Sequence, residues 1–359
     1  PEQSLPACAI LPPLRAPGVS LTGVLAVETP MKAAGPEQSF AAISTTVEAV
    51  PNGTQHIEDL QASDVTMAGS ADVEVTMGSG LLVLKGEDKM ETRAVTVHGE
   101  ALHIALVADG HGGKVAAVHA AATVIRALLS GIDGPPEGTL LQKAGERAFL
   151  RCHEEVLAMM DTTAGTTLTV CIVNPVRAEV TVLHSGDSVA RLVPRRSPAM
   201  ALCEDHRIDS SDTERQRLTN MGGKIARAID RYGRPSGPQR LWPGGVAQAR
   251  AIGDRDVGKF IDPRPHGRTT KLPTSESCAI VVCSDGVWDS LMPTAVDALV
   301  RSSMRNDANA SANLIVGAAL TQRHAYSQDG DCVPKDDTTC IILRVEDVDD
   351  KLSGKRSCC

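Results

Sequence analysis

The chain of 359 residues is poor in aromatic side chains, which make up only 2% of it. Proteins that bind single-stranded nucleic acid usually stack bases on aromatic side chains, so this scarcity argues against that class. The net charge of −8 also disfavours a partner with a phosphate backbone. Hydrophobic residues still reach 42%, so we expect a sizeable core built from aliphatic residues and no nucleic-acid partner.

The ten cysteines include no CxxC pair and no zinc-finger spacing. Cys171, Cys278, Cys283 and Cys340 lie in apolar, strand-like runs, which indicates small buried hydrophobic residues. We therefore expect a reducing, intracellular environment, cytoplasmic or nuclear, without a disulfide framework. No apolar run reaches the length of a transmembrane helix.

Composition divides the chain into three parts. Residues 1–75 are rich in Ala, Pro, Ser, Thr and Gly and predict a poorly ordered extension, followed by a domain at 76–347 and a tail at 348–359. Within the domain, the polar segment 209–245 predicts a surface excursion rather than core.

Hydrophobic periodicity predicts strands and helices in the domain. We expect strands at 102–108, 166–173, 178–183, 278–283 and 338–345, and helices at about 114–130, 140–160, 293–304 and 308–323. The apolar face of the first helix is predicted to carry Val115, Val118, Ala122, Ile125 and Leu129. The short connection between the second and third strands favours antiparallel pairing, so the fold class is α/β with antiparallel sheets and helices outside them.

Aspartates occur at the ends of three of these apolar strands. Asp109 follows the strand at 102–108, Asp285 follows the one at 278–283, and Asp336 and Asp337 precede the last. Carboxylates that converge on one place repel each other, and a hard divalent cation such as Mg²⁺ or Mn²⁺ removes that cost. A single aspartate more often caps a turn, so the metal hypothesis depends on the neighbouring residues.

Those neighbours resemble the metal-dependent (PPM, type 2C) serine/threonine protein phosphatases. Asp109-Gly110-His111-Gly112-Gly113 looks like the DGHGG signature of that family. Further segments that match the family, in the family's order, are Glu87-Asp88, Ala164–Thr167, Ser185–Ser188, Gly245–Asp254, Ser284–Asp289 and Lys335–Thr339. The resemblance covers about residues 80–346, and seven segments in order make a chance match very unlikely.

The resemblance implies a four-layer sandwich, in which two antiparallel sheets are flanked by helices on both outer faces. It also implies two Mn²⁺ or Mg²⁺ ions, with a weaker third. Asp109 would bridge the two ions, and the carbonyl of Gly110, Asp285 and Asp336 would complete the protein ligands. Glu87 and Asp88 would act through bound water, and Asp187 and Asp289 are candidates for the third ion.

The implied reaction is hydrolysis of phosphoserine and phosphothreonine in proteins, with a metal-bound hydroxide as nucleophile. His111 is the candidate general acid for the leaving alkoxide, and its alternative role is to tether the loop by hydrogen bonds. Asp254 and Arg250 are predicted to be structural supports. Phosphoprotein substrates and a monomeric state are expected.

The sequence departs from the family at the position that usually holds a basic, phosphate-gripping residue, which is Val83 here. Lys85 is the nearest substitute, although strand alternation would point it to the other face. The arginines of 209–245, which the resemblance identifies as a flap, could contact a phosphopeptide, although individually each is expected to be solvated. These arginines are Arg215, Arg217, Arg227, Arg231 and Arg234.

Two alternative functions stay open at this stage. One is a pseudophosphatase or weakly active phosphoprotein-binding module on the same fold, against which Asp109, Asp285, Asp336 and His111 argue. The other is a different dinuclear hydrolase such as a nuclease, which the acidic balance disfavours. The terminal pair Cys358-Cys359 resembles a prenylation end and suggests a membrane tether, whereas an unmodified, frayed tail is the plainer explanation.

Overall fold

The computed structural model describes residues 57–59, 73–159, 162–321 and 336–347. All of these residues belong to one compact unit, Gln38–Cys359. Within the described ranges, no helix combines the length and the apolar character needed to cross a membrane.

The predicted chain ends fall mostly outside the described residues. The tail at 348–359, with Cys358 and Cys359, lies wholly outside them, as does most of 1–75. Two described strands lie wholly or partly before residue 76, because Ile57–Asp59 pairs with a sheet strand and another strand begins at Val73.

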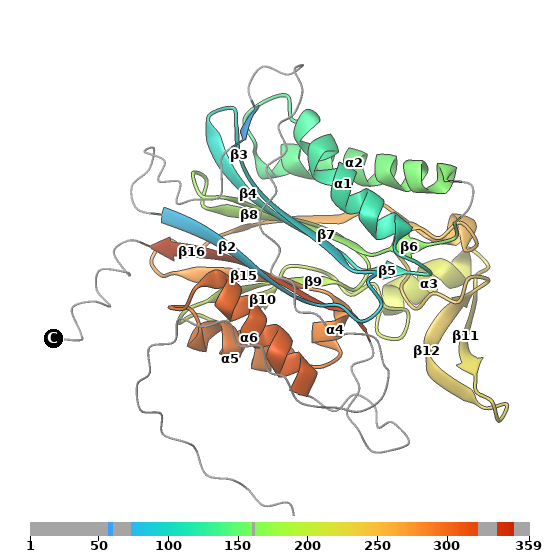
Figure 1. The fold of residues 1–359 in the computed structure, drawn as a ribbon. Helices are drawn as coiled ribbons and strands as arrows, with labels where there is room; N and C mark the ends of the chain where they lie inside the picture. Colours follow the sequence, from blue (N-terminus) through green and yellow to red (C-terminus); the bar gives the residue numbers. More distant parts are fainter. Residues whose placement is uncertain (1–56, 60–72, 160–161, 322–335, 348–359) are drawn as a thin grey trace, which may run out of the picture. The chain divides into compact units, whose positions relative to one another are not determined.

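Two antiparallel sheets form the centre of the described unit (Figure 1). The six-stranded sheet has the order β1-β3-β4-β7-β8-β14, and the five-stranded sheet has the order β10-β9-β15-β16-β2. Strands of the first sheet are β1 (Ile57–Asp59), β3 (Lys89–Val97), β4 (Glu100–Ala108), β7 (Leu168–Asn174), β8 (Glu179–Ser185) and β14 (His266–Lys271). Those of the second are β2 (Val73–Leu82), β9 (Val189–Pro194), β10 (Met200–Ala201), β15 (Cys278–Cys283) and β16 (Thr338–Asp347).

Helices cover the outer face of each sheet, so the fold has the four layers that were predicted (Figure 1). The first sheet packs against α1 (Val115–Ser130) and α2 (Gly138–Ala158), and the second against α5 (Pro293–Ser302) and α6 (Ala308–Thr321). Three apolar clusters fill the spaces between these layers. The cluster between the sheets contains residues of β4, β7, β15 and β16 and is aliphatic, as the composition requires.

The predicted cysteines lie in these strands as buried free thiols. Cys171, Cys278, Cys283 and Cys340 are all fully buried, and burial raises the pKa of the Cys278 thiol to about 12. They therefore act as small hydrophobic residues, which confirms that prediction.

The first helix is where predicted, but its buried face matches the prediction only at Ile125 and Leu129. Val115 and Val118 are exposed, whereas Ala116, Ala117 and Ala120 are buried against the first sheet. Small side chains let the helix approach the sheet closely, so alanine rather than valine occupies the inner face. Apolar spacing alone does not distinguish these two faces.

The segment 209–245 has more structure than predicted. It contains α3 (Asp212–Asn220) and a hairpin of β11 (Lys224–Ile229) and β12 (Pro235–Trp242). Leu218 and Leu241 are fully buried in a separate small core, so only part of the segment is a solvated excursion. Trp242, at the end of the hairpin, is half-exposed, and its indole N–H donates to the carbonyl of Ala226.

A three-stranded sheet of very short strands lies beside the two main sheets. It has the order β13-β6-β5, formed by Ile252–Gly253, Gly165–Thr166 and Gly110–His111. A 3₁₀ helix follows at Gly258–Phe260. This small sheet connects the end of β4 with the segment that carries Asp254, and so brings two motifs that are far apart in sequence together.

Candidate metal centre

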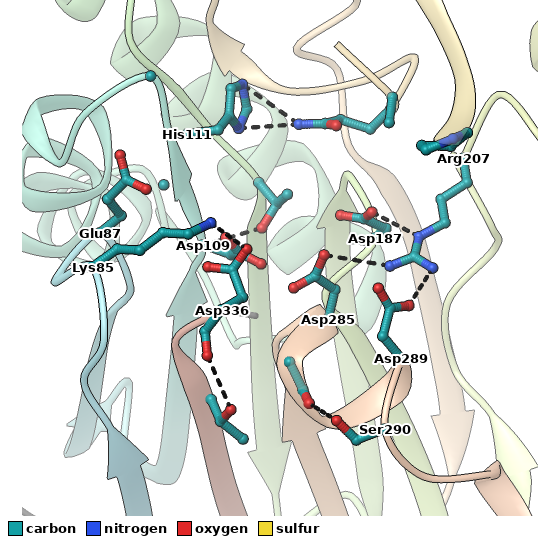
Figure 2. A pocket seen from close by; sticks show the side chains of 18 of the residues that line it. Lys85, Glu87, Asp109, His111, Asp187, Arg207, Asp285, Asp289, Ser290 and Asp336 are labelled. Carbon is teal, nitrogen blue, oxygen red and sulfur yellow. Dashed lines mark hydrogen bonds and ion pairs between the residues drawn. The ribbon is translucent and has the colours of Figure 1, made fainter. Parts of the chain in front are cut away.

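A cavity of about 730 Å³ opens where β4 ends and where the chain enters β16 and leaves β15. Asp109, Asp285 and Asp336 all line it, and Figure 2 shows their carboxylates gathered together. Other acidic residues that line the cavity are Glu87, Asp187, Asp209 and Asp289. The structure thus brings together residues that are up to about 250 positions apart in the chain.

The central aspartates are held by rigid elements of both sheets. Asp109 directly follows β4 of the first sheet. Asp285 begins the short helix α4 (Asp285–Trp288), two residues after β15, and Asp336 lies two residues before β16. β15 and β16 are neighbours in the second sheet, so one cavity receives carboxylates from both sheets.

The cavity is lined by more acidic than basic side chains. Burial, followed by the charges of Asp88 and Asp285, raises the pKa of Asp109 well above its usual value. Burial and the nearby Asp187 and Asp289 raise the pKa of Asp285 to about 8. Burial likewise raises the pKa of Asp88 to about 6, and its buried Oδ1 has no hydrogen-bond partner. These shifts show that ionised carboxylates are costly here without further positive charge.

Oxygen-only donors with excess negative charge fit a hard divalent cation such as Mg²⁺ or Mn²⁺. Asp109, Asp285 and Asp336 would hold it, together with the carbonyl of Gly110. A Cβ at Gly110 would come 2.8 Å from the carbonyl oxygen of Glu87, so glycine is required for the backbone to lie this close to that loop.

The loop that carries Lys85, Glu87 and Asp88 is anchored by Asp337. Its Oδ1 accepts hydrogen bonds from the backbone N–H groups of Leu84, Lys85 and Gly86, and its Oδ2 accepts those of Glu87 and Asp88. Although burial opposes ionisation, these N–H donors lower the pKa of Asp337. Asp337 does not line the cavity, and its role is to position the loop.

Lys85 lines the cavity, whereas Val83 does not. The prediction that strand alternation would point Lys85 away is wrong, because residues two apart share a face of a strand and because β2 already ends at Leu82. Beyond that point the chain turns, and the Lys85 ammonium lies 2.6 Å from the Asp336 carboxylate. Asp336 and other carboxylates keep the pKa of Lys85 above its usual value despite burial.

Glu87 and Asp88, although adjacent in the chain, have different surroundings in the structure. Glu87 lines the cavity and accepts a hydrogen bond from the N–H of Gly113 at 2.7 Å. Asp88 is 3% exposed, does not line the cavity, and accepts the hydroxyl of Thr339 at 2.6 Å. Of this predicted acidic pair, only Glu87 faces the cavity directly.

His111 lies at the rim of the cavity in β5, held from two sides. Its Nε2 is 2.7 Å from Asp254 Oδ1, and the side-chain amide of Gln248 lies 3.0 Å from its Nδ1. Burial is the largest single influence and lowers the pKa of His111, but the charge and hydrogen bond of Asp254, together with the charges of Asp187 and Glu87, make the net shift upward. Asp254 therefore supports His111, which fits the structural role predicted for it.

Arg250 also occupies the supporting position predicted for it. Its guanidinium pairs with Glu214 at 2.6 Å and with Asp262 at 3.1 Å, and it does not line the cavity. It joins α3 to the segment that precedes β13.

Sequence reasoning missed Arg207. Its guanidinium lies 2.8 Å from Asp187, 2.6 Å from Asp289 and 3.4 Å from Asp285 (Figure 2). Arg240 and Gln248 were also missed as cavity-lining residues. Nothing in the local sequence around Arg207 distinguishes it from the many other arginines nearby, so no sequence signal identified it.

The five flap arginines that were expected to be mostly solvated do not line the cavity. Four pair with carboxylates of the same region, and the remaining one, Arg231, lies over the ring of Tyr232. The four pairs are Arg215–Asp212, Arg217–Glu214, Arg227–Asp209 and Arg234–Asp230.

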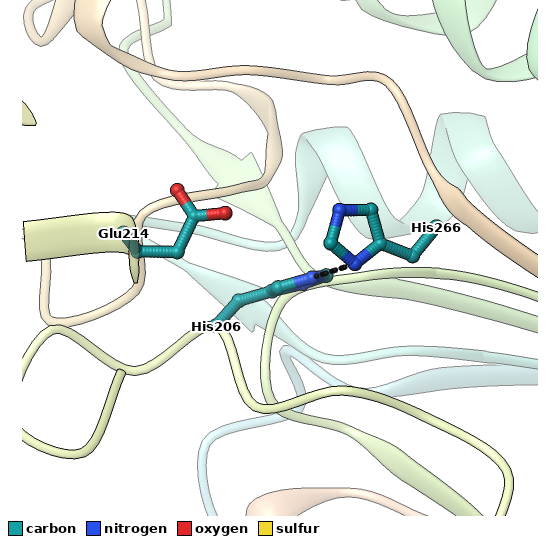
Figure 3. Close-up of side chains that lie close together, drawn as sticks. All are labelled: His206, Glu214 and His266. Carbon is teal, nitrogen blue, oxygen red and sulfur yellow. Dashed lines mark hydrogen bonds between the residues drawn. The ribbon is translucent and has the colours of Figure 1, made fainter. Parts of the chain in front are cut away.

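A second cluster with metal-ligand chemistry is formed by His206, Glu214 and His266 (Figure 3). Both oxygens of Glu214 already accept hydrogen bonds, from Arg217 and Arg250 at 2.6 Å. The N–H of Gly186 donates to His206 Nδ1 at 3.1 Å, so the proton of the neutral ring sits on Nε2, which faces His266 Nδ1. These bonds favour a hydrogen-bonded structural cluster over a cation site.

Comparison with known proteins agrees with this geometry. The family model described as protein phosphatase 2C matches residues 79–325. A probable protein phosphatase 2C 5 of Arabidopsis thaliana is 32% identical, over 76% of this chain and 62% of its own. A probable protein phosphatase 2C 69 of Oryza sativa subsp. japonica is 34% identical, over 66% and 53%. The chain thus spans little more than half the length of these relatives.

Solved structures share the fold at low sequence identity. A serine-threonine phosphatase 2C from Toxoplasma gondii superposes with a TM-score of 0.58 at 16% identity, covering 81% of this chain and 99% of that one. A C. elegans sex determining protein gives 0.62 at 17% identity, covering 75% and 64%. The family model and the 32–34% identical relatives go further than the fold. The chain belongs to the protein phosphatase 2C family.

Proposed function

We propose that this chain hydrolyses phosphoserine and phosphothreonine in proteins with a dinuclear Mn²⁺ or Mg²⁺ centre. The observation that carries the proposal is the meeting of Asp109, Asp285 and Asp336, from both sheets, in one cavity with raised carboxyl pKa values. Such a set of oxygen donors has little reason to converge unless cations bind there. Membership of the phosphatase family supplies the reaction class.

In this proposal Asp109, Asp285 and Asp336, together with the carbonyl of Gly110, would hold the two ions. Glu87 acts through bound water because it lines the cavity, and Asp88 supports from behind because it is buried. The ions, when bound, would lower the pKa of a shared water to supply a hydroxide and would neutralise the phosphate.

The protein's own residues then handle the phosphate and the leaving group. Lys85 would bind a phosphate oxygen, exchanging its contact with Asp336 for one with substrate, and so replace the basic residue that Val83 displaces. His111 would donate a proton to the leaving alkoxide, since Asp254 favours its protonated form. Monomeric action on phosphoproteins inside the cell completes the proposal.

Manganese-dependent turnover of a phosphothreonine peptide tests this function. Wild type should release phosphate with Mn²⁺ and stop when EDTA is added, and Asp109→Ala should lose about 10³-fold or more of the rate. Equal rates for wild type and Asp109→Ala would instead identify a pseudophosphatase. Cleavage of a plasmid substrate, in place of the peptide, would identify a nuclease.

A further inference from the structure

The carboxylates that line the cavity fall into two groups. Asp109 and Asp336 lie on the side of Lys85, whereas Asp187 and Asp289 lie on the side of Arg207, and Asp285 stands between them (Figure 2). On the second side, each of three guanidinium nitrogens faces a different residue: Nε faces Asp187, Nη1 faces Asp289 and Nη2 faces Asp285. One fixed positive charge therefore serves three carboxylates.

A divalent ion that used the same three carboxylates would need their oxygens at about 2.0–2.6 Å. The guanidinium already holds those of Asp187 and Asp289 at 2.8 and 2.6 Å. Its plane and its charge exclude a second cation from the same oxygens. Occupation by Arg207 and occupation by an ion are thus alternatives.

The backbone of Arg207 is fixed, which holds the base of its side chain beside these carboxylates. Its N–H donates to Asp205 at 2.9 Å, and the next residue, the fully buried Ile208, donates its N–H to the carbonyl of Ala247 at 2.9 Å. The preceding residue, His206, is 1% exposed and accepts the N–H of Gly186. Gly186 immediately precedes Asp187, so the partners of this ion pair are held by one hydrogen-bonded unit.

We propose that Arg207 is a built-in cation that replaces a divalent ion on the Asp187–Asp289 side and confines metal binding to the Asp109–Asp336 side. This inference rests on the proposed function, because it concerns the same centre. It replaces the weaker third ion, for which Asp187 and Asp289 were candidates, with a side chain of the protein. Arg207 is a positioning residue in this role, since it acts on the carboxylates and not on substrate.

Counting bound Mn²⁺ tests the inference without relying on turnover. Isothermal titration calorimetry, with electron paramagnetic resonance of free Mn²⁺, would be applied to wild type, Arg207→Gln and Arg240→Gln. Arg240 lines the same cavity but donates to the carbonyl of Gly245 at 2.6 Å, so it is the matched control. Wild type and Arg240→Gln should bind about two ions per chain, and Arg207→Gln about three.

A double variant shows where the additional ion binds. Asp187→Asn combined with Arg207→Gln should return the count to about two, because it removes a carboxylate of the vacated position. Thermal melts establish that each variant is folded, and Arg207→Met, which keeps the aliphatic stem, replaces Arg207→Gln if the latter melts too early.

Equal counts for wild type and the Arg207 variants would overturn the inference, as would three ions in wild type. Either outcome leaves the proposed function intact, provided wild type turns over phosphothreonine with Mn²⁺. If wild type does not hydrolyse the phosphothreonine peptide with Mn²⁺, the proposed function is refuted. One additional bound ion in Arg207→Gln would still support the role of Arg207 in that case.

Discussion

At the scale of single residues, the Asp337 carboxylate organises more of the site than any other side chain that does not enter the cavity. It accepts backbone N–H groups from five consecutive residues, 84–88. Hydrogen bonds to a charged acceptor are about twice as strong as neutral ones, and removing the acceptor leaves the donors unsatisfied. The loop that presents Lys85 and Glu87 therefore depends on one carboxylate.

Asp337→Ala should destabilise the protein by on the order of 3–5 kcal/mol, because the N–H donors lose a common partner. Urea denaturation followed by circular dichroism measures this change. Asp133→Ala, at an exposed aspartate, is the control and should stay within about 0.5 kcal/mol of wild type. A loss no larger than that of the control would show that water replaces the carboxylate.

The sequence allowed cavity residues to be predicted where they adjoin a strand. Asp109, Asp285 and Asp336 were expected to lie together because each adjoins an apolar run and each stands in a segment that resembles a motif of the family, and all three line the same cavity. Arg207 could not, because its three partners are 20, 78 and 82 positions away and no periodic pattern links them. An ion pair between residues far apart in the chain cannot be predicted from the local sequence around either residue.

At the scale of elements, the contact of α6 with β2 depends on two glycines of the strand. A Cβ at Gly78 would overlap the backbone of Ala308 and Asn309 in α6. A Cβ at Gly80 would come 2.8 Å from the side-chain oxygen of Asn313, one turn further along the same helix. Glycine here permits the helix to lie directly on the sheet. Elsewhere in the same helix, Gly317 has open space around its Cβ position.

Gly78→Ala should therefore lower the melting temperature, with a loss of about 1–3 kcal/mol from overpacking. Gly317→Ala should leave it unchanged or raise it, because alanine has a helix propensity about 1 kcal/mol better than glycine. Differential scanning calorimetry of the two variants beside wild type gives the answer. Equal stability of Gly78→Ala and Gly317→Ala would mean that α6 moves away from the sheet at little cost.

Element types followed from the sequence more readily than their faces or ends. The strand at Cys278–Cys283 has the predicted bounds, because an uninterrupted run of six apolar residues indicates both ends of a buried strand. The buried face of α1 could not be predicted correctly from the sequence. The buried alanines at 116, 117 and 120 are less hydrophobic than the exposed valines at 115 and 118. Lys85 was misplaced because strand alternation was applied beyond the end of β2, where the backbone N–H of Lys85 instead donates to Asp337, 252 positions away.

At the scale of the whole molecule, a cation in the cavity would join the two sheets, because Asp109 belongs to one and Asp285 and Asp336 to the other. A ligand that binds only the folded state at 100 times its Kd stabilises that state by about 2.7 kcal/mol. Binding of Mn²⁺ at this place would therefore stabilise the whole fold as well as serve the proposed reaction.

Without Mn²⁺, the melting temperature should fall by a few degrees between pH 6.5 and pH 8. The pKa of Asp285 is about 8 in the folded state against 3.8 for an unperturbed carboxyl. The folded protein thus retains a proton that the unfolded chain releases, and stability is lost as pH rises toward 8. Saturating Mn²⁺ should raise the melting temperature and remove this decline.

Thermal melts at several pH values, with EDTA or Mn²⁺, measure this linkage. Asp285→Asn, which has no carboxyl to titrate, should show a shallower decline in EDTA. A melting temperature in EDTA that is constant from pH 6.5 to pH 8 would contradict the prediction. The four-layer architecture itself was predicted through the family resemblance, whereas this coupling between the sheets required the structure.

The scarcity of aromatic residues has a practical consequence for spectroscopy. The chain has two tryptophans. Trp242 is half-exposed at the end of the β11–β12 hairpin, whereas Trp288 is partly buried in α4 beside Asp289, with its indole N–H donating to the carbonyl of Cys283. Intrinsic fluorescence therefore contains one signal from the hairpin and one from α4, the short helix that begins at the cavity residue Asp285. Replacing either indole with phenylalanine leaves a label-free optical probe of the other place.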